Sequence, residues 1–214
     1  MGRWGHCMFE GDQDADISHE INQAVMGDDE SQPVFLWAFY FRRGKRGDFP
    51  KMDLSVYREK FDSGIADKLF AEYRAKESFR DAYSYRYRII VLAAKMMHVG
   101  AKLKPELIQY IREILPKIPS REGRQWIVDD GFRGPGHRQF LASLDNYKSG
   151  TPRSFDQLSC HGCGKVASDI GRPLLRCAGC TIAHGWYCDK ECQKKDRKAH
   201  KKSCGTQDPF SLNI

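Results

Sequence analysis

Residues 187 to 204, YCDKECQKKDRKAHKKSC, hold the pattern that decides the fold of this chain. The stretch combines three cysteines and one histidine with seven lysines and arginines. Cysteine and histidine at such spacing indicate a metal site, whereas a basic run is typical of a nucleic-acid-binding surface. Ligands further upstream separate these two interpretations.

Potential metal ligands occur as four pairs, two of them spaced C-x2-C and two spaced so that residues i and i+4 share one face of a helix. A continuous helix separates Cys192 from His200 by about 12 Å, which metal bonds of about 2.0 to 2.3 Å cannot span. Each late pair therefore needs an early pair, in a sequential or an interleaved arrangement. The eight residues are Cys160, Cys163, Cys177, Cys180, Cys188, Cys192, His200 and Cys204.

Eight ligands fill two tetrahedral sites and leave neither with an open position, so the pattern predicts two structural Zn(II) ions and no catalytic metal. Clustered cysteines in a chain without a secretory signal are more often metal ligands than disulfides. A segment of this length cannot build a sufficient core, and metal binding worth about 10 to 16 kcal/mol in comparable fingers replaces it.

The order C-x2-C, C-x2-C, YC-x3-CQ and H-x3-C resembles the MYND-type zinc finger over residues 160–204. The match includes Tyr187, Gln193 and Asp196. This resemblance implies interleaved ligands, with the first and third pairs on one zinc and the second and fourth pairs on the other. It also implies a protein-interaction module, several members of which take short proline-rich peptides beside the zinc helix.

The predicted partner-binding residues are Trp186, Gln193 and Arg197. Peptide-binding MYND fingers commonly carry a tryptophan directly after the aspartate, where this chain has Arg197. The flat apolar wall of the usual peptide pocket is therefore missing. Trp186 either supplies aromatic surface for a partner or packs on the zinc core, and the sequence favours neither role.

The chain has a net charge of +7, which invites a nucleic-acid interpretation. From Leu158 onward, ten lysines and arginines face five acidic residues, and seven thiolates with two Zn(II) ions reduce the formal excess to about +2. Much of the basic run then compensates the metal clusters. A nucleic-acid-binding zinc helix is the first alternative function, and a nuclear-import signal is a further explanation of the run.

The first block of the chain is mostly helical by its apolar spacing. Clear helices are expected over 65–76, 87–100 and 105–116, and others around Ile17 to Val25 and around Phe140 to Leu144. The composition of residues 33–41 suits a buried strand or a core helix, and we favour a helix. Residues 42–51 read as a loop, and RGPG at 133–136 reads as a turn.

The opening MGRWGHCMFEGDQDADI resembles an uncharacterised domain family and fungal MYND-finger proteins that begin in the same way, which implies no known activity. We expect Trp4 and Phe9 to anchor the N-terminus, and the aspartates to supply first-turn charge for a helix. A carboxylate site built from Glu10, Asp12 and Asp14 would make an enzyme of this block. No convergent residues elsewhere support it, so no enzyme is expected.

The expected organisation is a helical domain over 1–147, a polar linker over 148–157, the finger over 158–206 and a tail over 207–214. No apolar run approaches the roughly 18 to 20 residues that span a bilayer, so no membrane partner is expected. The predicted fold class is mostly α, with a small cross-braced two-zinc finger. The predicted protein is an intracellular adaptor in the nucleus or cytoplasm that binds a protein or short peptide, with a link to transcription.

Overall fold

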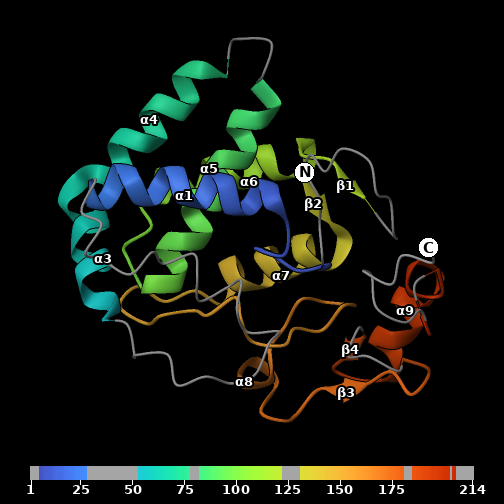
Figure 1. Cartoon of the computed structure of the whole chain (residues 1–214). Helices are drawn as coiled ribbons and strands as arrows, with labels where there is room; N and C mark the ends of the chain where they lie inside the picture. Colours follow the sequence, from blue (N-terminus) through green and yellow to red (C-terminus); the bar gives the residue numbers. More distant parts are fainter. Residues whose placement is uncertain are drawn as a thin grey trace, which may run out of the picture. The chain divides into compact units, whose positions relative to one another are not determined.

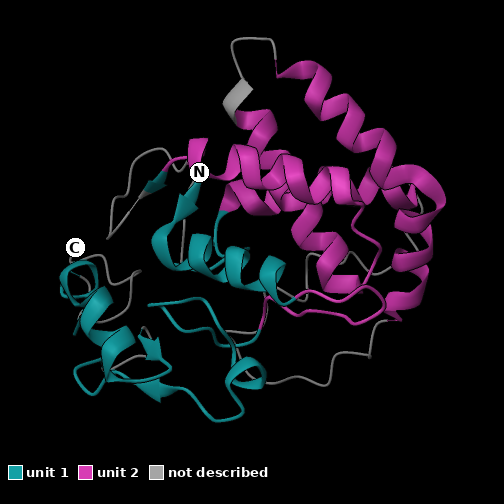
Figure 2. Ribbon diagram, turned by 180° about the vertical axis from the view of Figure 1, so that it is seen from behind, with its two compact units in different colours: residues 1–11, 120–146, 157–214 teal, residues 12–119, 147–156 magenta. Residues whose placement is uncertain are grey.

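The computed structural model describes residues 5–27, 53–77, 82–121, 131–180, 185–202 and 204–205. Four predictions lie outside these residues: those for Trp4, the helix favoured at 33–41, the loop at 42–51 and the tail. The fold is mostly α with a small finger region, as predicted. The chain divides into two compact units, one of residues 1–11, 120–146 and 157–214, the other of residues 12–119 and 147–156 (Figure 2).

The unit of residues 12–119 and 147–156 is helical, and α5 forms its centre (Figure 1). Helices α1, α3, α4 and α6 all contact α5, whose residues 89–94 are fully buried. The predicted helices of this unit are confirmed, with small shifts at their ends. The elements are α1 (Asp12–Met26), α3 (Leu54–Lys60), η2 (Phe61–Ile65), α4 (Ala66–Lys76), α5 (Ala82–Val99), α6 (Pro105–Ile114) and η3 (Leu115–Lys117).

The ends of these helices follow local sequence signals. Pro105 stands in the first turn of α6, where its missing N–H costs nothing. Gly100 ends α5 with a φ of +79°, a left-handed conformation that glycine adopts without steric cost. The Arg58 side chain donates a hydrogen bond to the carbonyl of Val99 at 2.9 Å, which satisfies one of the last carbonyls of α5.

Buried polar side chains join α1 to α5. The Tyr87 hydroxyl donates to Asp14 Oδ1 at 2.5 Å, and Lys95 Nζ donates to Ser18 Oγ at 2.8 Å. Asp14 is fully buried, so it binds within the core as well as contributing first-turn charge. The carboxylate of Glu10 accepts a hydrogen bond from the Cys7 amide instead. These hydrogen bonds engage both carboxylates, and no metal-ligand group among the described residues includes either of them.

Residues 148–157, expected as a linker, form backbone hydrogen bonds with the end of α5. The amide of Gly150 donates to the carbonyl of Gly100 at 2.9 Å, and that of Arg153 donates to the carbonyl of Met97 at 2.9 Å. Phe155 is buried. The segment up to Asp156 therefore completes the helical unit. Whether the predicted domains fold independently is a separate question from these contacts, so the predicted domain boundaries stay a prediction.

The other unit contains the finger and the preceding helix. Its elements are β1 (Ser120–Arg121), β2 (Phe132–Arg133), α7 (Gly134–Asp145), α8 (Ala167–Ile170), β3 (Leu175–Arg176), β4 (Trp186–Tyr187) and α9 (Lys190–His200). Strands β1 and β2 pair in parallel. Strands β3 and β4 form an antiparallel pair, in which Leu175 is opposite Tyr187 and Arg176 is opposite Trp186.

The prediction of a turn at RGPG, residues 133–136, is wrong, because α7 begins at Gly134. Pro135 takes a position in the first helical turn, which its fixed φ favours. Gly136 is needed for packing, since a Cβ there would lie 3.1 Å from the carbonyl oxygen of His6. Its amide donates a hydrogen bond to that same oxygen at 2.8 Å. The Gly-Pro-Gly sequence therefore marks the start of a helix, at which the backbone of Gly136 approaches that of His6.

The N-terminal segment packs against α7, as the anchoring prediction for Phe9 required. Phe9 is buried and adopts a φ of +62°, and the neighbouring Met8 is buried as well. The Met8 amide donates to Gln139 Oε1 of α7 at 3.0 Å. Residues 5–11 and α7 therefore belong to the same packed body as the finger.

Candidate metal centres

The first metal-ligand group consists of Cys160, Cys163, Cys188 and Cys192. Their sulfur atoms all lie within 4.8 Å of one another, and the Sγ atoms of Cys163 and Cys188 are 3.3 Å apart. Two members come from the first turn of the finger, one follows β4 and one lies in the first turn of α9. The group joins the first and third pairs of the sequence pattern.

The second group consists of Cys177, Cys180, His200 and Cys204. The Sγ atom of Cys180 lies 3.3 Å from His200 Nε2 and 3.9 Å from Cys204 Sγ. Cys177 Sγ lies 3.8 Å from Cys204 Sγ. The second and fourth pairs therefore meet, and the two groups are cross-braced, which is the interleaved arrangement that the resemblance implied.

Local hydrogen bonds place the ligands. The Gly164 amide donates to the carbonyl of Cys160 at 2.7 Å, which closes the first C-x2-C turn. Asp189 caps α9 by accepting a hydrogen bond from the Cys192 amide at 2.7 Å, so that Cys192 faces inward from the first turn. At the other end, the Cys204 amide donates to the carbonyl of His200 at 2.8 Å and carries the chain back to the second group.

Both groups fit a tetrahedral zinc ion. Zinc–sulfur bonds of about 2.3 Å place the sulfur atoms about 3.8 Å apart, close to the spacing found in the second group. A glycine makes room for the histidine ligand, since a Cβ on Gly185 would lie 2.8 Å from His200 Cε1. Three thiols with an imidazole, and four thiols, are donor sets that zinc prefers. The two sites hold structural zinc, because protein atoms fill all four positions of each.

The electrostatics of the groups call for a cation. Burial raises the pKa of the Cys180 thiol to about 11 and that of the Cys192 thiol to about 12. Burial acts against ionisation of Cys160 too, yet backbone N–H groups of Cys188 and Cys163 hold its pKa below the ordinary value. Burial lowers the pKa of His200, which keeps its imidazole neutral, as a metal ligand must be. Zinc supplies the positive charge that four clustered thiolates require.

Arg138 of α7 is a supporting residue that the sequence did not reveal. Its Nη2 donates to Asp196 Oδ1 at 3.0 Å, and its Nε donates to the carbonyl of His161 in the first C-x2-C turn. Asp196 is buried and also accepts a hydrogen bond from the Tyr187 hydroxyl at 2.8 Å. Arg138 lies 58 residues before Asp196, and no local pattern links two residues so far apart.

The predicted partner-binding residues occupy different environments. Arg197 is exposed on α9. Gln193 is partly buried, and its side chain acts to lower the pKa of the Cys177 thiol, a metal ligand. Trp186 is partly buried, with its indole Nε1 enclosed and unmatched by any acceptor in the described part of the chain. Trp186 is therefore partly packed into the finger and partly available as aromatic surface, the two roles between which the sequence did not decide.

The site defines a small finger with two cross-braced zinc centres. Residues 160–204 match the family model of the MYND finger. Fingers of this family are generally zinc-binding modules for protein interaction, with no catalytic role of their own. No curated protein and no solved structure gave a match to the chain.

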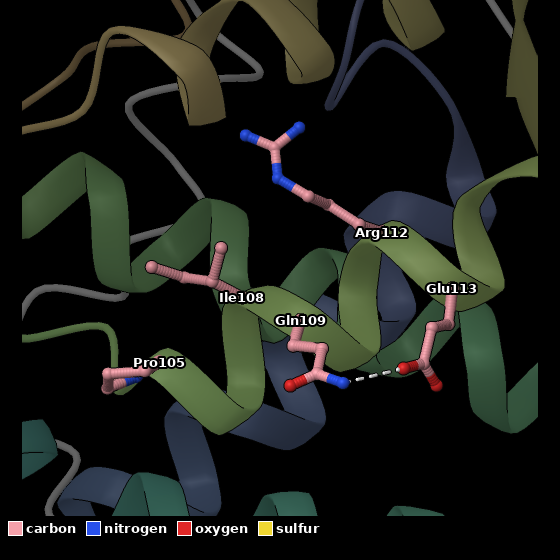
Figure 3. Close-up of a pocket in the computed structure, with 5 residues that line it drawn as sticks. All are labelled: Pro105, Ile108, Gln109, Arg112 and Glu113. Atoms are coloured by element: carbon pink, nitrogen blue, oxygen red, sulfur yellow. Dashed lines mark hydrogen bonds between the residues drawn. The ribbon is translucent and has the colours of Figure 1, made fainter.

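Outside the finger, the described residues offer little that resembles a second site. A shallow pocket of about 550 Å³ follows α6, lined by Pro105, Ile108, Gln109, Arg112 and Glu113 (Figure 3). Gln109 donates a hydrogen bond to Glu113 at 3.1 Å, and the Arg112 side chain points away from that pair. All five residues belong to one helix, so they do not converge on a ligand. Among the described helices, none is both long and apolar enough to cross a membrane.

Proposed function

We propose that the chain is an adaptor whose zinc finger recognises a partner protein through a short peptide segment. The observation that carries this proposal is the completeness of both metal groups. Each has four protein ligands within 4.8 Å of one another, which leaves no coordination position for a substrate or water. Zinc in such a site stabilises the fold of the finger and takes no part in a reaction. We therefore assign the finger a role in recognising a partner protein.

The recognition surface is proposed to include Trp186, Gln193 and Arg197. Gln193 and Trp186 are partly exposed, and Leu175 on β3 is an exposed apolar residue of the same unit. Related fingers take proline-rich peptides, and Arg197 in place of tryptophan would change the preferred sequence in this chain. The proposed setting is the nucleus or cytoplasm, with the partner belonging to the transcription machinery.

Affinity capture from the native cell tests the proposal. The intact chain is compared with Cys192→Ala, which removes one ligand of the first metal group, and with Cys7→Ala, which removes the cysteine outside both groups. A third variant, Trp186→Ala with Gln193→Ala, alters the proposed surface. Zinc content is measured for each, because this third variant is informative only when it keeps two ions.

Partners that Cys7→Ala retains, and that Cys192→Ala and the surface variant both lose, would support the proposal. Their binding is then measured directly with purified proteins by calorimetry. An identical partner list for the intact chain and Cys192→Ala would overturn the proposal, since the finger would then have no part in recognition.

A further inference from the structure

Helix α9 presents two faces of opposite character. Cys192, Asp196 and His200 point inward and are buried. Because successive residues are turned by about 100°, four basic residues on the outer side lie within about 60° of one another. We define this basic stripe as Lys190, Lys194, Arg197 and Lys201, all of which are exposed.

Among the described residues, no acidic side chain forms an ion pair with the stripe. The ion pairs of the finger join Arg138 to Asp196 and Arg172 to Asp189. In the part of the chain that the structure describes, no ion pair includes a member of the basic stripe. Its members are three or four residues apart, so they repel one another along the helix surface. The helix therefore keeps an arrangement of charge that its own stability does not favour.

Helix stability and metal compensation account for only part of the stripe. Arg197 and Lys201 lie near the C-terminal end of α9, where positive charge is favourable, but Lys190 and Lys194 lie in the first turns, where it is unfavourable. The thiolate of Cys192 faces the other side of the helix. At physiological ionic strength, exposed charges are screened over about 8 Å. A negatively charged partner would account for the positive charge that helix stability and metal compensation leave unexplained.

The chemistry beside the stripe favours a peptide over a nucleic acid. Helix α9 contacts β4, and β4 pairs with β3. Strand β3 exposes Leu175, which is 54% accessible to solvent. Carboxylates combined with an apolar side chain match such a surface.

We propose that the basic stripe of α9 binds a peptide segment that carries several aspartates or glutamates, beside an apolar residue that contacts Leu175. This inference rests on the proposed function of the finger and specifies the chemistry of its partner. Arg197, where related fingers have a tryptophan, is then a carboxylate-binding residue. The departure from the family pattern changes the preferred peptide instead of abolishing binding.

A random peptide library displayed on phage, panned against the zinc-loaded full chain, tests the inference. Affinities of the selected peptides are then measured by fluorescence anisotropy for two variants of equal charge. Lys194→Gln with Arg197→Gln removes two charges from the stripe. Lys195→Gln with Lys202→Gln removes two exposed charges outside the stripe, one on the same helix and one just after its end. A 20-base-pair DNA duplex is titrated in parallel at several salt concentrations.

The inference expects selected peptides rich in aspartate and glutamate, whose affinity falls about tenfold in the stripe variant and less than about threefold in the control. Equal losses in the two variants, or selected peptides without acidic enrichment, would overturn it and leave the adaptor function standing. DNA binding that falls steeply with salt and depends on the stripe would overturn it in favour of nucleic acid. Selection of no peptide would overturn it too. Only partner capture that is insensitive to Cys192→Ala overturns the adaptor function.

Discussion

Arg138 and Asp196 form a 3.0 Å ion pair that ties α7 to the zinc helix α9. The Asp196 side chain is only 4% exposed, while that of Arg138 is 26% exposed. Arg138 also binds the carbonyl of His161, between two ligands of the first metal group. One arginine outside the matched segment therefore connects both ends of the finger, so the finger and α7 share their stability.

Replacing Arg138 by alanine should destabilise this unit by about 2 to 3 kcal/mol, because a buried carboxylate loses its charged partner. The measurement is denaturant unfolding of the zinc-loaded chain. Arg172→Ala is the matched control. Its ion pair with Asp189 spans 3.9 Å between largely exposed side chains, and such a pair contributes at most about 0.5 kcal/mol. Equal losses in the two variants would contradict the role of Arg138.

Gly164 should be far less tolerant of substitution than Gly171. Both adopt a positive φ, of +80° and +66°, so alanine costs backbone strain of about 1 to 2 kcal/mol at either position. A Cβ at Gly164 would also lie 1.9 Å from the carbonyl oxygen of Arg138, whereas nothing lies within 4 Å of one at Gly171. Gly164→Ala should therefore lower the melting temperature clearly more than Gly171→Ala. Similar shifts would mean that α7 does not approach this turn.

The metal groups could be predicted from the sequence because their geometry is local. Pairs spaced C-x2-C form turns, and pairs such as Cys188 and Cys192 lie one helical turn apart, so each pair is fixed by its own backbone. Helix ends marked by Pro105 and Gly100 were predictable for the same reason. Spacing alone left the crossed arrangement open, and the family resemblance supplied it.

Features that depend on distant packing escaped prediction. The approach of α7 to the first metal turn involves Arg138, Gly164 and Asp196, which no periodicity relates. RGPG at 133–136 begins a helix and is not a turn, because proline and glycine mark helix starts as well as turns. The close approach of Gly136 to His6 is a distant contact that the local sequence does not show. The hydrogen bonds between 148–157 and the end of α5 also join residues far apart in the sequence, which composition does not show.

Each metal group should lose its ion independently when one ligand is removed. Purified protein should hold two zinc ions per chain by elemental analysis, and Cys192→Ala and His200→Ala should each hold about one. Cys7→Ala, outside both groups, should keep two. Strong chelators should unfold the finger, since zinc binding supplies its folding free energy, yet leave most of the helical signal that α5 and its neighbours contribute. A wild-type chain with fewer than two ions would refute the two-site assignment.

Lys95 should make the stability of the helical unit depend on pH. Burial lowers the pKa of its ammonium group well below the usual value, so there is a pH range below about 10.4 in which the folded state holds a neutral amine while the unfolded chain binds a proton. Between these two pKa values the unfolded state carries one more proton. The free energy of unfolding then rises with pH, by up to about 1.4 kcal/mol per unit. The contribution is complete above the unfolded pKa and is lost as pH falls towards the folded one.

Lys95→Met, which keeps the length of the side chain, removes this titration. The free energy of unfolding of the wild type minus that of Lys95→Met should therefore increase as the pH rises towards about 10, measured by urea denaturation at each pH. Taking this difference cancels titrating groups that both proteins share. Lys104→Met is the matched control, because Lys104 is an exposed lysine whose pKa is raised, chiefly by its hydrogen bond from Nζ to Asp67. A pH-independent difference for Lys95→Met would show that Lys95 is charged in the folded protein.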